Sequence, residues 1–372
     1  MRDLIVFGED FGGLPSSTQH IITRLNPQRR ILWVNSIGLR RPRLSASDMK
    51  RAYHKLFSKN TDKASMATKV QSIPSNMEVI SLKTLPAPKF AWERKLAKSW
   101  MASQLAPTLE RLEFNKPILW TSLPTAADLC GHINESSVVY YCGDDFGALA
   151  GVDHKTVIQH ENKLTDRANL ILTASEAMQQ RFPACKTQLL RHGVDYERFS
   201  TPAPRAADLP TGKPIAGFYG SLSNWLDYDL INQTAKAMPD WNFVFIGRNE
   251  LAHNPFADLD NIHLLGPRPH HELPSYSQHW DVSLLPFILN EQIKACSPLK
   301  LMEYVACGTP VITTPFPALK PFEDQVNVVN DSKQLIDCLS RHQRLTPCQS
   351  HSVANESWQQ RSQFVDWLLE LL

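Results

Sequence analysis

Long hydrophobic runs are missing from this sequence. No segment approaches the roughly 20 apolar residues that a transmembrane helix needs. The apolar run near the N-terminus, Leu4–Phe7, is too short for the core of a secretory signal peptide. Any association with a membrane is therefore expected to be peripheral.

Paired cysteines and an excess of one charge are also missing. The seven cysteines are scattered and include no C-x-x-C spacing, which predicts reduced thiols in a cytosolic protein rather than disulfides or a zinc site. The 39 Lys and Arg residues nearly balance the 37 Asp and Glu residues, so the formal charge of +2 gives no reason to expect a nucleic-acid partner. His270 and His271 lack acidic or cysteine partners at ligand spacing, and we predict no metal site.

What the sequence does contain is a repeated alternation of short apolar runs and longer amphipathic segments. With 372 residues the chain exceeds the usual size of one hydrophobic core, so two domains are expected. The apolar runs do not alternate with polar residues, which is typical of parallel strands buried on both faces. The expected strands are Leu4–Phe7, Ile31–Val34, Val79–Leu82, Ile118–Trp120, Val138–Tyr141, Leu170–Leu172, Ile215–Tyr219, Phe243–Ile246, Ile262–Leu265, Val282–Leu285 and Val311–Thr313.

A proline-rich stretch, Ser200–Pro214, separates the two halves of the pattern. We therefore expect an α/β protein with two Rossmann-like domains facing a cleft, residues 1–198 and residues 199–354. The remaining residues, 355–372, contain an amphipathic helix. Its apolar side is expected to hold Trp358, Phe364, Trp367, Leu368 and Leu371.

Two basic segments stand out in the first half. Between Arg40 and Lys69, nine residues are Lys or Arg and two are acidic. The second segment, Lys89–Met101, interleaves cations with apolar residues. On a helix, four of the apolar residues would form a patch surrounded by lysine and arginine side chains: Phe90, Leu96, Trp100 and Met101. This pattern is typical of a segment in an anionic membrane interface, although a solvated helix with its apolar residues turned into the core fits it equally well.

The most informative segment runs from Ser297 to Ile312. A serine N-cap followed by proline opens a helix, a glycine ends it, and a strand follows. Lys300 adds a full charge beside the free N–H groups of the helix N-terminus, which suits a diphosphate. Glu303, one turn further, can accept hydrogen bonds from ribose hydroxyls. An ordinary exposed ion pair between Lys300 and Glu303 is the alternative.

This segment resembles the nucleotide-sugar signature of the group-one glycosyltransferases, whose GT-B fold pairs two Rossmann-like domains. Other motifs of that family stand around it in the expected order, over roughly residues 137 to 320. They are Arg191–Asp195, Gly217–Ser221, Phe245–Arg248, Leu264–Gly266, Leu273–Tyr276 and Asp281–Phe287. The Ser-x-x-Lys opening also resembles that of membrane-associated bacterial polysaccharide transferases such as the glucuronosyltransferase of xanthan assembly.

The resemblance implies a nucleotide-sugar donor, with uridine as the preferred base, bound without a metal or other cofactor. The donor-binding residues that it implies are Gly220, Ser221, Arg248, Ser297, Leu299, Lys300 and Glu303. It also implies that the C-terminal helix returns to the first domain.

The sequence departs from the family pattern at one position. Many retaining members carry a glutamate eight residues before the one matched by Glu303, and that position is Ala295 here. Two carboxylates directly after an expected strand, Asp144 and Asp145, lie where the resemblance places the catalytic aspartate. We predict Asp144 as the base that deprotonates the acceptor hydroxyl, with Asp145 as orienter or alternate. A helix cap is the alternative role for this pair.

The loop after the first expected strand, Gly8–His20, is rich in glycine but lacks the G-x-G-x-x-G fingerprint, so NAD is not expected. Some of its residues, and a histidine near the linker, are predicted to line the cleft near the acceptor or the donor phosphates. These residues are Gly12, Gly13, Ser17, His20 and His192. A tight strand-to-helix turn explains the loop equally well.

Together these features predict a glycosyltransferase of bacterial surface polysaccharide assembly, an exopolysaccharide pathway included. It would move a hexosyl or uronosyl group from a nucleoside-diphosphate sugar to a lipid-linked saccharide acceptor at the cytoplasmic face of the inner membrane. Two alternatives stay open. An epimerase or hydrolase of the same fold would turn over the sugar nucleotide without an acceptor, and a silent assembly partner would bind the donor and transfer nothing.

Overall fold

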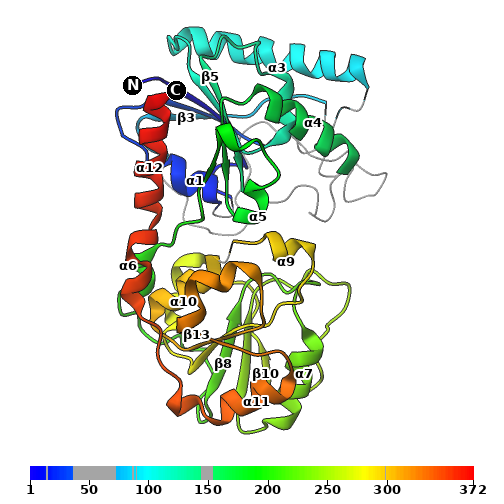
Figure 1. The fold of residues 1–372 in the computed structure, drawn as a ribbon, viewed down its shortest axis with the longest axis vertical. Helices are drawn as coiled ribbons and strands as arrows, with labels where there is room; N and C mark the ends of the chain where they lie inside the picture. Colours follow the sequence, from blue (N-terminus) through cyan, green and yellow to red (C-terminus); the bar gives the residue numbers. More distant parts are fainter. Residues whose placement is uncertain (14–15, 37–72, 86–87, 89, 144–153, 298) are drawn as a thin grey trace. The chain divides into compact units, whose positions relative to one another are not determined.

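The structure is a computed structural model that describes residues 1–13, 16–36, 73–85, 88, 90–143, 154–297 and 299–372. It divides into a first unit, Met1–Arg191 with Arg361–Leu372, and a second unit, His192–Gln360. The borders expected from the sequence lie after residues 198 and 354. Each unit is built on one parallel sheet with helices against it (Figure 1). The expected α/β class with two Rossmann-like domains is confirmed.

The sheet of the first unit has seven parallel strands in the order β3-β2-β1-β4-β5-β6-β7. Their bounds are β1 (Leu4–Phe7), β2 (Ile31–Val34), β3 (Met77–Ile80), β4 (Ile118–Thr121), β5 (Ser137–Cys142), β6 (Leu170–Thr173) and β7 (Thr187–Leu189). All residues of β1, β2, β4, β5 and β6 are buried, as their unbroken apolar runs predict. The strand order reverses between β1 and β4, where open sheets of this kind bind ligands.

Helices and short 3-10 helices connect these strands. Their bounds are α1 (Ser17–Ile22), α3 (Ala91–Arg111), η1 (Pro124–Asp128), α4 (His154–Arg167), α5 (Glu176–Gln179) and η2 (Ala184–Lys186). The long helix α3 is held against η1 by Arg94, which donates to the two carboxylate oxygens of Asp128 at 2.9 and 2.7 Å. Its buried stripe is Ala97, Met101 and Leu105, spaced four residues apart.

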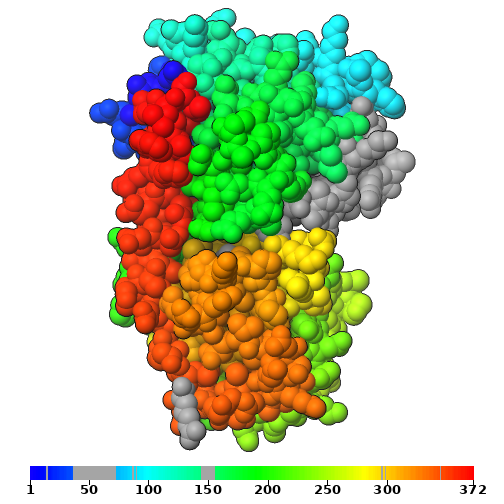
Figure 2. Space-filling view, viewed as in Figure 1, coloured from blue at the N-terminus to red at the C-terminus, as the bar shows by residue number. Residues whose placement is uncertain are grey.

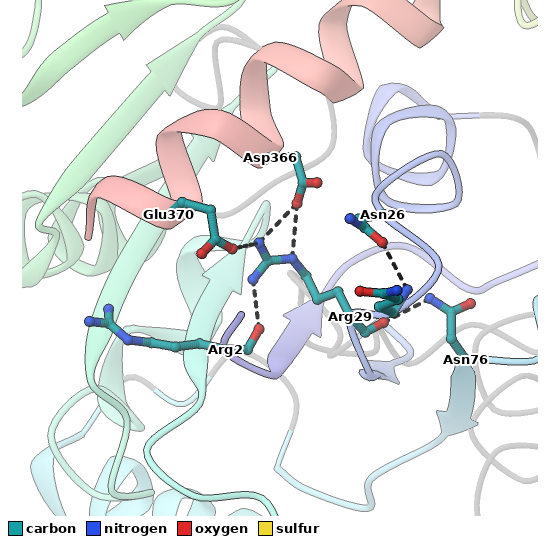
Figure 3. A network of polar contacts seen from close by, with 7 residues as sticks. Arg2, Asn26, Arg29, Asn76, Asp366 and Glu370 are labelled. Atoms are coloured by element: carbon teal, nitrogen blue, oxygen red, sulfur yellow. Dashed lines mark hydrogen bonds and ion pairs between the residues drawn. The ribbon is translucent and has the colours of Figure 1, made fainter.

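The last helix, α12 (Trp358–Leu371), belongs to the first unit from Arg361 onward. The fully buried guanidinium of Arg29 donates to Asp366 Oδ1 at 2.9 Å, to Glu370 Oε1 at 2.6 Å and to the Arg2 carbonyl at 2.6 Å (Figure 3). A buried cation is costly unless it is paired and hydrogen-bonded in this way. The charge network therefore fixes the C-terminal half of α12 within the first unit.

The residues through which α12 packs against the protein differ in part from those expected. Of the five residues expected on one apolar side, Trp358 and Leu368 are buried. The other three are exposed: Phe364, Trp367 and Leu371. Figure 2 shows the surface of α12 in red. The expectation of a single apolar side is wrong, because the helix packs through Val365 and Leu369 and leaves a second apolar stripe in solvent.

The sheet of the second unit has six parallel strands in the order β10-β9-β8-β11-β12-β13. Their bounds are β8 (Ile215–Tyr219), β9 (Asn242–Ile246), β10 (Ile262–Leu264), β11 (Val282–Leu285), β12 (Val311–Thr313) and β13 (Val326–Val328). The helices are α6 (Tyr196–Ser200), α7 (Tyr228–Ala237), η3 (His270–Glu272), α8 (Pro274–Ser277), α9 (Glu291–Ala295), α10 (Leu299–Cys307), η4 (Pro317–Gln325), α11 (Ser332–Ser340), η5 (His342–Arg344) and η6 (Ser350–Glu356). The order again reverses at the first strand, between β8 and β11.

The two chain segments at the borders of the second unit pair with each other. The Val194 amide donates to the Glu356 carbonyl at 2.9 Å, and the Trp358 amide donates to the Val194 carbonyl at 3.2 Å. The His192 ring lies 6.2 Å from the Trp358 ring, centroid to centroid. His192, a predicted acceptor-side residue, therefore lies at this paired border and packs on α12.

Candidate functional site

Two glycines shape the carboxyl edge of the second sheet. Gly220 follows β8 with a φ of +141°, and Gly247 follows β9 with a φ of +157°. A Cβ atom on Gly247 would lie 1.8 Å from the Gly220 carbonyl oxygen, and one on Gly220 would lie 2.3 Å from Cε of Lys300. Side chains are therefore excluded at both positions, and the backbone after β8 lies directly against the lysine.

Lys300 lies in the first turn of α10, a helix that packs on the sheet through Leu301, Met302 and Val305. The Lys300 ammonium forms no ion pair or hydrogen bond with any residue that the structure describes. The alternative of a pair with Glu303 is wrong, because the Glu303 carboxylate is buried and bonded to other groups. A half-buried cation beside a helix N-terminus remains available for an anion.

Two further polar groups belong to this edge. The hydroxyl of Ser297, just before α10, is buried and has no hydrogen-bond partner within the described parts of the chain. Arg248 follows Gly247 and is exposed, and its backbone carbonyl accepts from the Leu222 amide at 2.9 Å, beside the half-buried Ser221. We call this group the α10 site; it consists of Gly220, Ser221, Arg248, Ser297, Leu299, Lys300 and Glu303.

The Glu303 carboxylate is only 3% exposed, and each of its oxygens has one partner. Tyr219 donates its phenol proton to Oε2 at 2.7 Å, and Nε2 of His270 lies 2.7 Å from Oε1. Burial raises the pKa of the Tyr219 phenol well above its ordinary value, and the charge of Glu303 adds to the effect. The phenol is therefore a permanent donor. Tyr304 completes the group by accepting the Tyr219 amide at 3.1 Å.

His270 is the residue that reasoning from sequence missed. The sequence shows it beside His271 and without metal-ligand partners, and nothing there predicts a role in donor binding. The structure brings it to Glu303, 33 residues further along the chain. No local pattern could reveal this contact, since it forms only when η3 and α10 meet on one sheet.

Several predicted residues of the first unit lie in parts of the chain that the structure does not describe. Asp144 and Asp145 lie outside the described residues, as does the segment from Arg40 to Lys69. The last described part of β5 is anchored by Tyr140, whose phenol donates to the buried Glu161 at 2.7 Å. Asp144 is the second residue after β5 in the sequence, and its assignment as the base stays a prediction.

The loop after β1 forms a turn whose polar groups bond to one another. Gly12 donates to the Gln19 side chain at 3.2 Å, and the Gly13 amide donates to the Asp10 carbonyl at 3.1 Å. Ser17 begins α1, and Nδ1 of His20 lies 3.1 Å from the Arg24 guanidinium. These contacts agree with the turn, while a role toward an acceptor stays a prediction for all four predicted residues.

A metal site is not evident in the second sheet or elsewhere in the described residues, where no group of three or more His, Cys, Asp or Glu side chains is arranged to hold an ion. No described helix combines the length and the apolar character that crossing a bilayer requires.

The family model "Glycosyl transferases group 1" matches residues 213–342, the part of the chain that contains β8 to β13 and the α10 site. A curated relative from Bacillus subtilis (strain 168), provisionally named a teichuronic acid biosynthesis glycosyltransferase, TuaH, is 25% identical over 274 residues. The match covers 67% of this chain and 69% of the relative. These two matches support a group-one glycosyltransferase, with the family model confined to the second unit.

Similar solved structures show that this chain has the GT-B fold. The Anabaena protein Alr3699/HepE, solved in complex with UDP and glucose, superposes with a TM-score of 0.69 at 14% identity, and the match covers 100% of both chains. An E. coli trehalose-6-phosphate protein bound with UDP-2-fluoro glucose gives 0.66 at 13% identity, over 100% of this chain and 99% of the other. WaaG, a glycosyltransferase of lipopolysaccharide biosynthesis, gives 0.56 at 11% identity over 98% and 95%.

Proposed function

We propose that this glycosyltransferase takes its sugar from a nucleoside-diphosphate sugar bound at the α10 site. The observation that carries the proposal is the Lys300 ammonium, which lies against Gly220 at the N-terminus of α10 and has no described anionic partner. The unpartnered Ser297 hydroxyl and the exposed Arg248 add a donor and a second cation at the same edge. UDP in two of the similar solved structures supports uridine as the base.

The chemistry follows from charge. As the bond between sugar and phosphate breaks, negative charge develops on the departing diphosphate, and donors aimed at that charge lower the barrier. Lys300 and the free N–H groups of α10 supply such donors without a metal ion. Glu303 holds the ribose. Asp144 takes the proton of the acceptor hydroxyl as that oxygen attacks the sugar, which gives an inverting reaction.

The acceptor is proposed to be a lipid-linked saccharide at a membrane surface. Helix α3 supports this: Trp92 and Trp100 are 65% and 47% exposed, and Phe90 and Leu96 are exposed as well. Lys95 and Lys98 lie between them in the sequence. Met101, expected in this patch, is buried in the core. Aromatic rings among lysines suit an anionic interface at the cytoplasmic face of a membrane. The teichuronic acid biosynthesis named for the TuaH relative supports a saccharide acceptor.

The donor site is tested by a thermal-shift screen with UDP, GDP, ADP, CDP and dTDP, since a ligand that binds the folded state raises the midpoint of unfolding. Lys300→Ala should weaken binding of the best diphosphate about tenfold to hundredfold, the loss expected for a hydrogen bond to a charged group. Lys294→Ala is the matched control, because this lysine lies on the neighbouring α9 and pairs with the exposed Glu291 at 2.7 Å.

Equal affinities of Lys300→Ala and Lys294→Ala would refute the α10 site as a diphosphate site. The base is tested separately. Asp144→Ala should keep donor binding and lose transfer by a factor of about 100 or more. If Asp145→Ala loses transfer while Asp144→Ala does not, the roles of the two are reversed.

A further inference from the structure

The surroundings of Glu303 are unusual for a buried carboxylate. The side chain is 4% exposed, yet neither a lysine nor an arginine bonds to it directly. Its two partners are the phenol of Tyr219 and the imidazole of His270. Taking an ionised carboxylate out of water costs free energy that a direct cation would offset better. Two of the roughly four lone-pair positions of the carboxylate are used by these partners. The remaining positions have no hydrogen-bond partner among the described residues.

The contacts of His270 define which ring nitrogen carries the proton. Arg198 lies with its guanidinium 3.2 Å from Nδ1 of His270, and a guanidinium can only donate. Nδ1 must therefore accept, so the proton of the neutral ring is on Nε2 and is donated to Oε1 of Glu303. Asp195 holds Arg198 from the other side at 3.2 Å.

These contacts form one chain from the border of the second unit to the α10 site. Asp195 and Arg198 belong to the segment directly after Val194, which pairs with the residues before α12. His270 packs edge-to-face on Phe199 of α6, with ring centroids 5.3 Å apart. The ring is thus fixed in its plane by α6 and in its tautomer by Arg198.

We propose that His270 is a positioning residue for donor binding: it orients the Glu303 carboxylate toward the ribose hydroxyls and ties that carboxylate to α6 through Arg198. The inference rests on the proposed donor site and goes beyond it by naming the group that keeps Glu303 in place. The ligand chemistry is that of a vicinal diol, the 2′,3′-hydroxyls of a nucleoside diphosphate.

The test compares two probes by calorimetric titration: the best ribonucleoside diphosphate of the screen (UDP, GDP, ADP or CDP) and its 2′,3′-dideoxy form. Wild type should bind the hydroxylated probe about tenfold or more tightly than the dideoxy one, as expected for hydrogen bonds to a carboxylate. His270→Ala should reduce this ratio to about threefold or less, because Glu303 is released. His270→Gln should restore most of the ratio, since its amide nitrogen can donate from nearly the position of Nε2.

His271→Gln is the matched control. This neighbouring histidine is half exposed and only approaches Glu272, at 3.8 Å, so the ratio should stay at the wild-type value. If His270 has only a structural role, His270→Ala would weaken the binding of both probes equally and leave the ratio of their affinities unchanged. That result would overturn the proposal. So would a wild-type ratio near one.

If His270→Ala does not fold, His270→Asn tests the proposal in its place. Its shorter amide reaches the position of Nδ1 rather than Nε2, so it should fold and still show the reduced ratio. A wild-type ratio retained in His270→Asn contradicts the proposal. If wild type binds none of the five diphosphates, the donor site itself is wrong, and this outcome differs from binding without discrimination.

Discussion

The two units share the strand order of six strands, to which the first unit adds β7, but they differ at the carboxyl edges of their sheets. In the first unit, the loop after β1 is closed by its own contacts, with Gly12 bonded to Gln19 and Ser16 donating to Glu9 at 2.9 Å. In the second unit, the loop after β8 lies against Lys300, whose ammonium has no described partner. The strand order places loops at the carboxyl edge of each sheet, but only polar groups without a partner in the protein are available there to bind a ligand.

Glycines at the two edges illustrate the same difference. Gly12 has a φ of +76° and nothing within 4 Å of the position of a Cβ atom. Gly247 has a φ of +157° and would drive a Cβ atom into the Gly220 carbonyl. The first glycine has the backbone conformation of a turn, whereas the second lets two strand ends approach each other beside the lysine.

The largest effect should come from Gly247→Ala. The methyl group would force β8 and β9 apart at their ends, and we expect a loss of about 3 kcal/mol or more in the free energy of unfolding. Gly12→Ala, the matched control, should lose about 1 kcal/mol, the cost of the backbone conformation alone. Calorimetric unfolding measures both. Equal losses would show that the contact between the two strand ends is not tight.

A smaller effect is expected within the first unit, at Asp128. Burial alone would raise the pKa of this carboxyl, but hydrogen bonds from Arg94 and Lys163 outweigh it and lower the pKa from 3.8 to about 2. Because the folded pKa is the lower one, the stabilisation is present above pH 3.8 and is lost as the pH falls toward 2. It amounts to about 2 kcal/mol.

Asp128→Asn should therefore unfold about 2 kcal/mol more easily at pH 7, and the gap to wild type should close between pH 4 and pH 2. Asp337→Asn is the control, because its pair with Arg341 on α11 is exposed on both sides. Exposed pairs contribute less than about 1 kcal/mol. A gap at Asp128 that persists unchanged to low pH would exclude the ion pair as its cause.

The smallest effect on stability should come from the two exposed apolar stripes of the first unit. The double variants Trp92→Ser with Trp100→Ser on α3, and Phe364→Ser with Trp367→Ser on α12, should each change the free energy of unfolding by about 0.5 kcal/mol or less. Their membrane affinities should differ, since lysines accompany only the α3 stripe in the sequence.

Sedimentation with vesicles that contain phosphatidylglycerol measures that difference. The α3 variant should bind about tenfold more weakly than wild type, and the α12 variant should bind like wild type. Vesicles of phosphatidylcholine alone control for charge. The proposed membrane surface would be wrong if the α3 variant kept full affinity, or if both variants lost it equally.

Strand prediction succeeded at the centre of each sheet but missed two of the four edge strands. β1, β2, β8, β11 and β12 have the expected bounds, because strands buried on both faces must be continuously apolar. β7 and β13 were not expected at all, and β3 begins two residues before its expected start. β7 and β13 lie at sheet edges and are only partly buried, so their sequences carry no strong pattern.

Prediction of the site divides in a similar way. The expected helix with its N-terminal lysine is present in α10, since caps and charges near a helix end act within a few residues of the chain. The partners of Glu303 were not foreseen. Tyr219 lies 84 residues before it and His270 lies 33 residues before it, and neither belongs to a spacing rule.

Local composition alone fixed the α/β alternation, the division into two sheets and the cationic tip of α10, because apolar runs and a charge near a helix end are properties of neighbouring residues. The fold decided whether that tip would be neutralised. Glu303, three residues along the same helix, turned inward to Tyr219 and His270, and the lysine was left with its charge unpaired by any described residue. Glu303 could pair with Lys300 or turn inward to Tyr219 and His270. Which arrangement costs less free energy depends on how deeply the carboxylate is buried, and that is decided only when distant segments pack together.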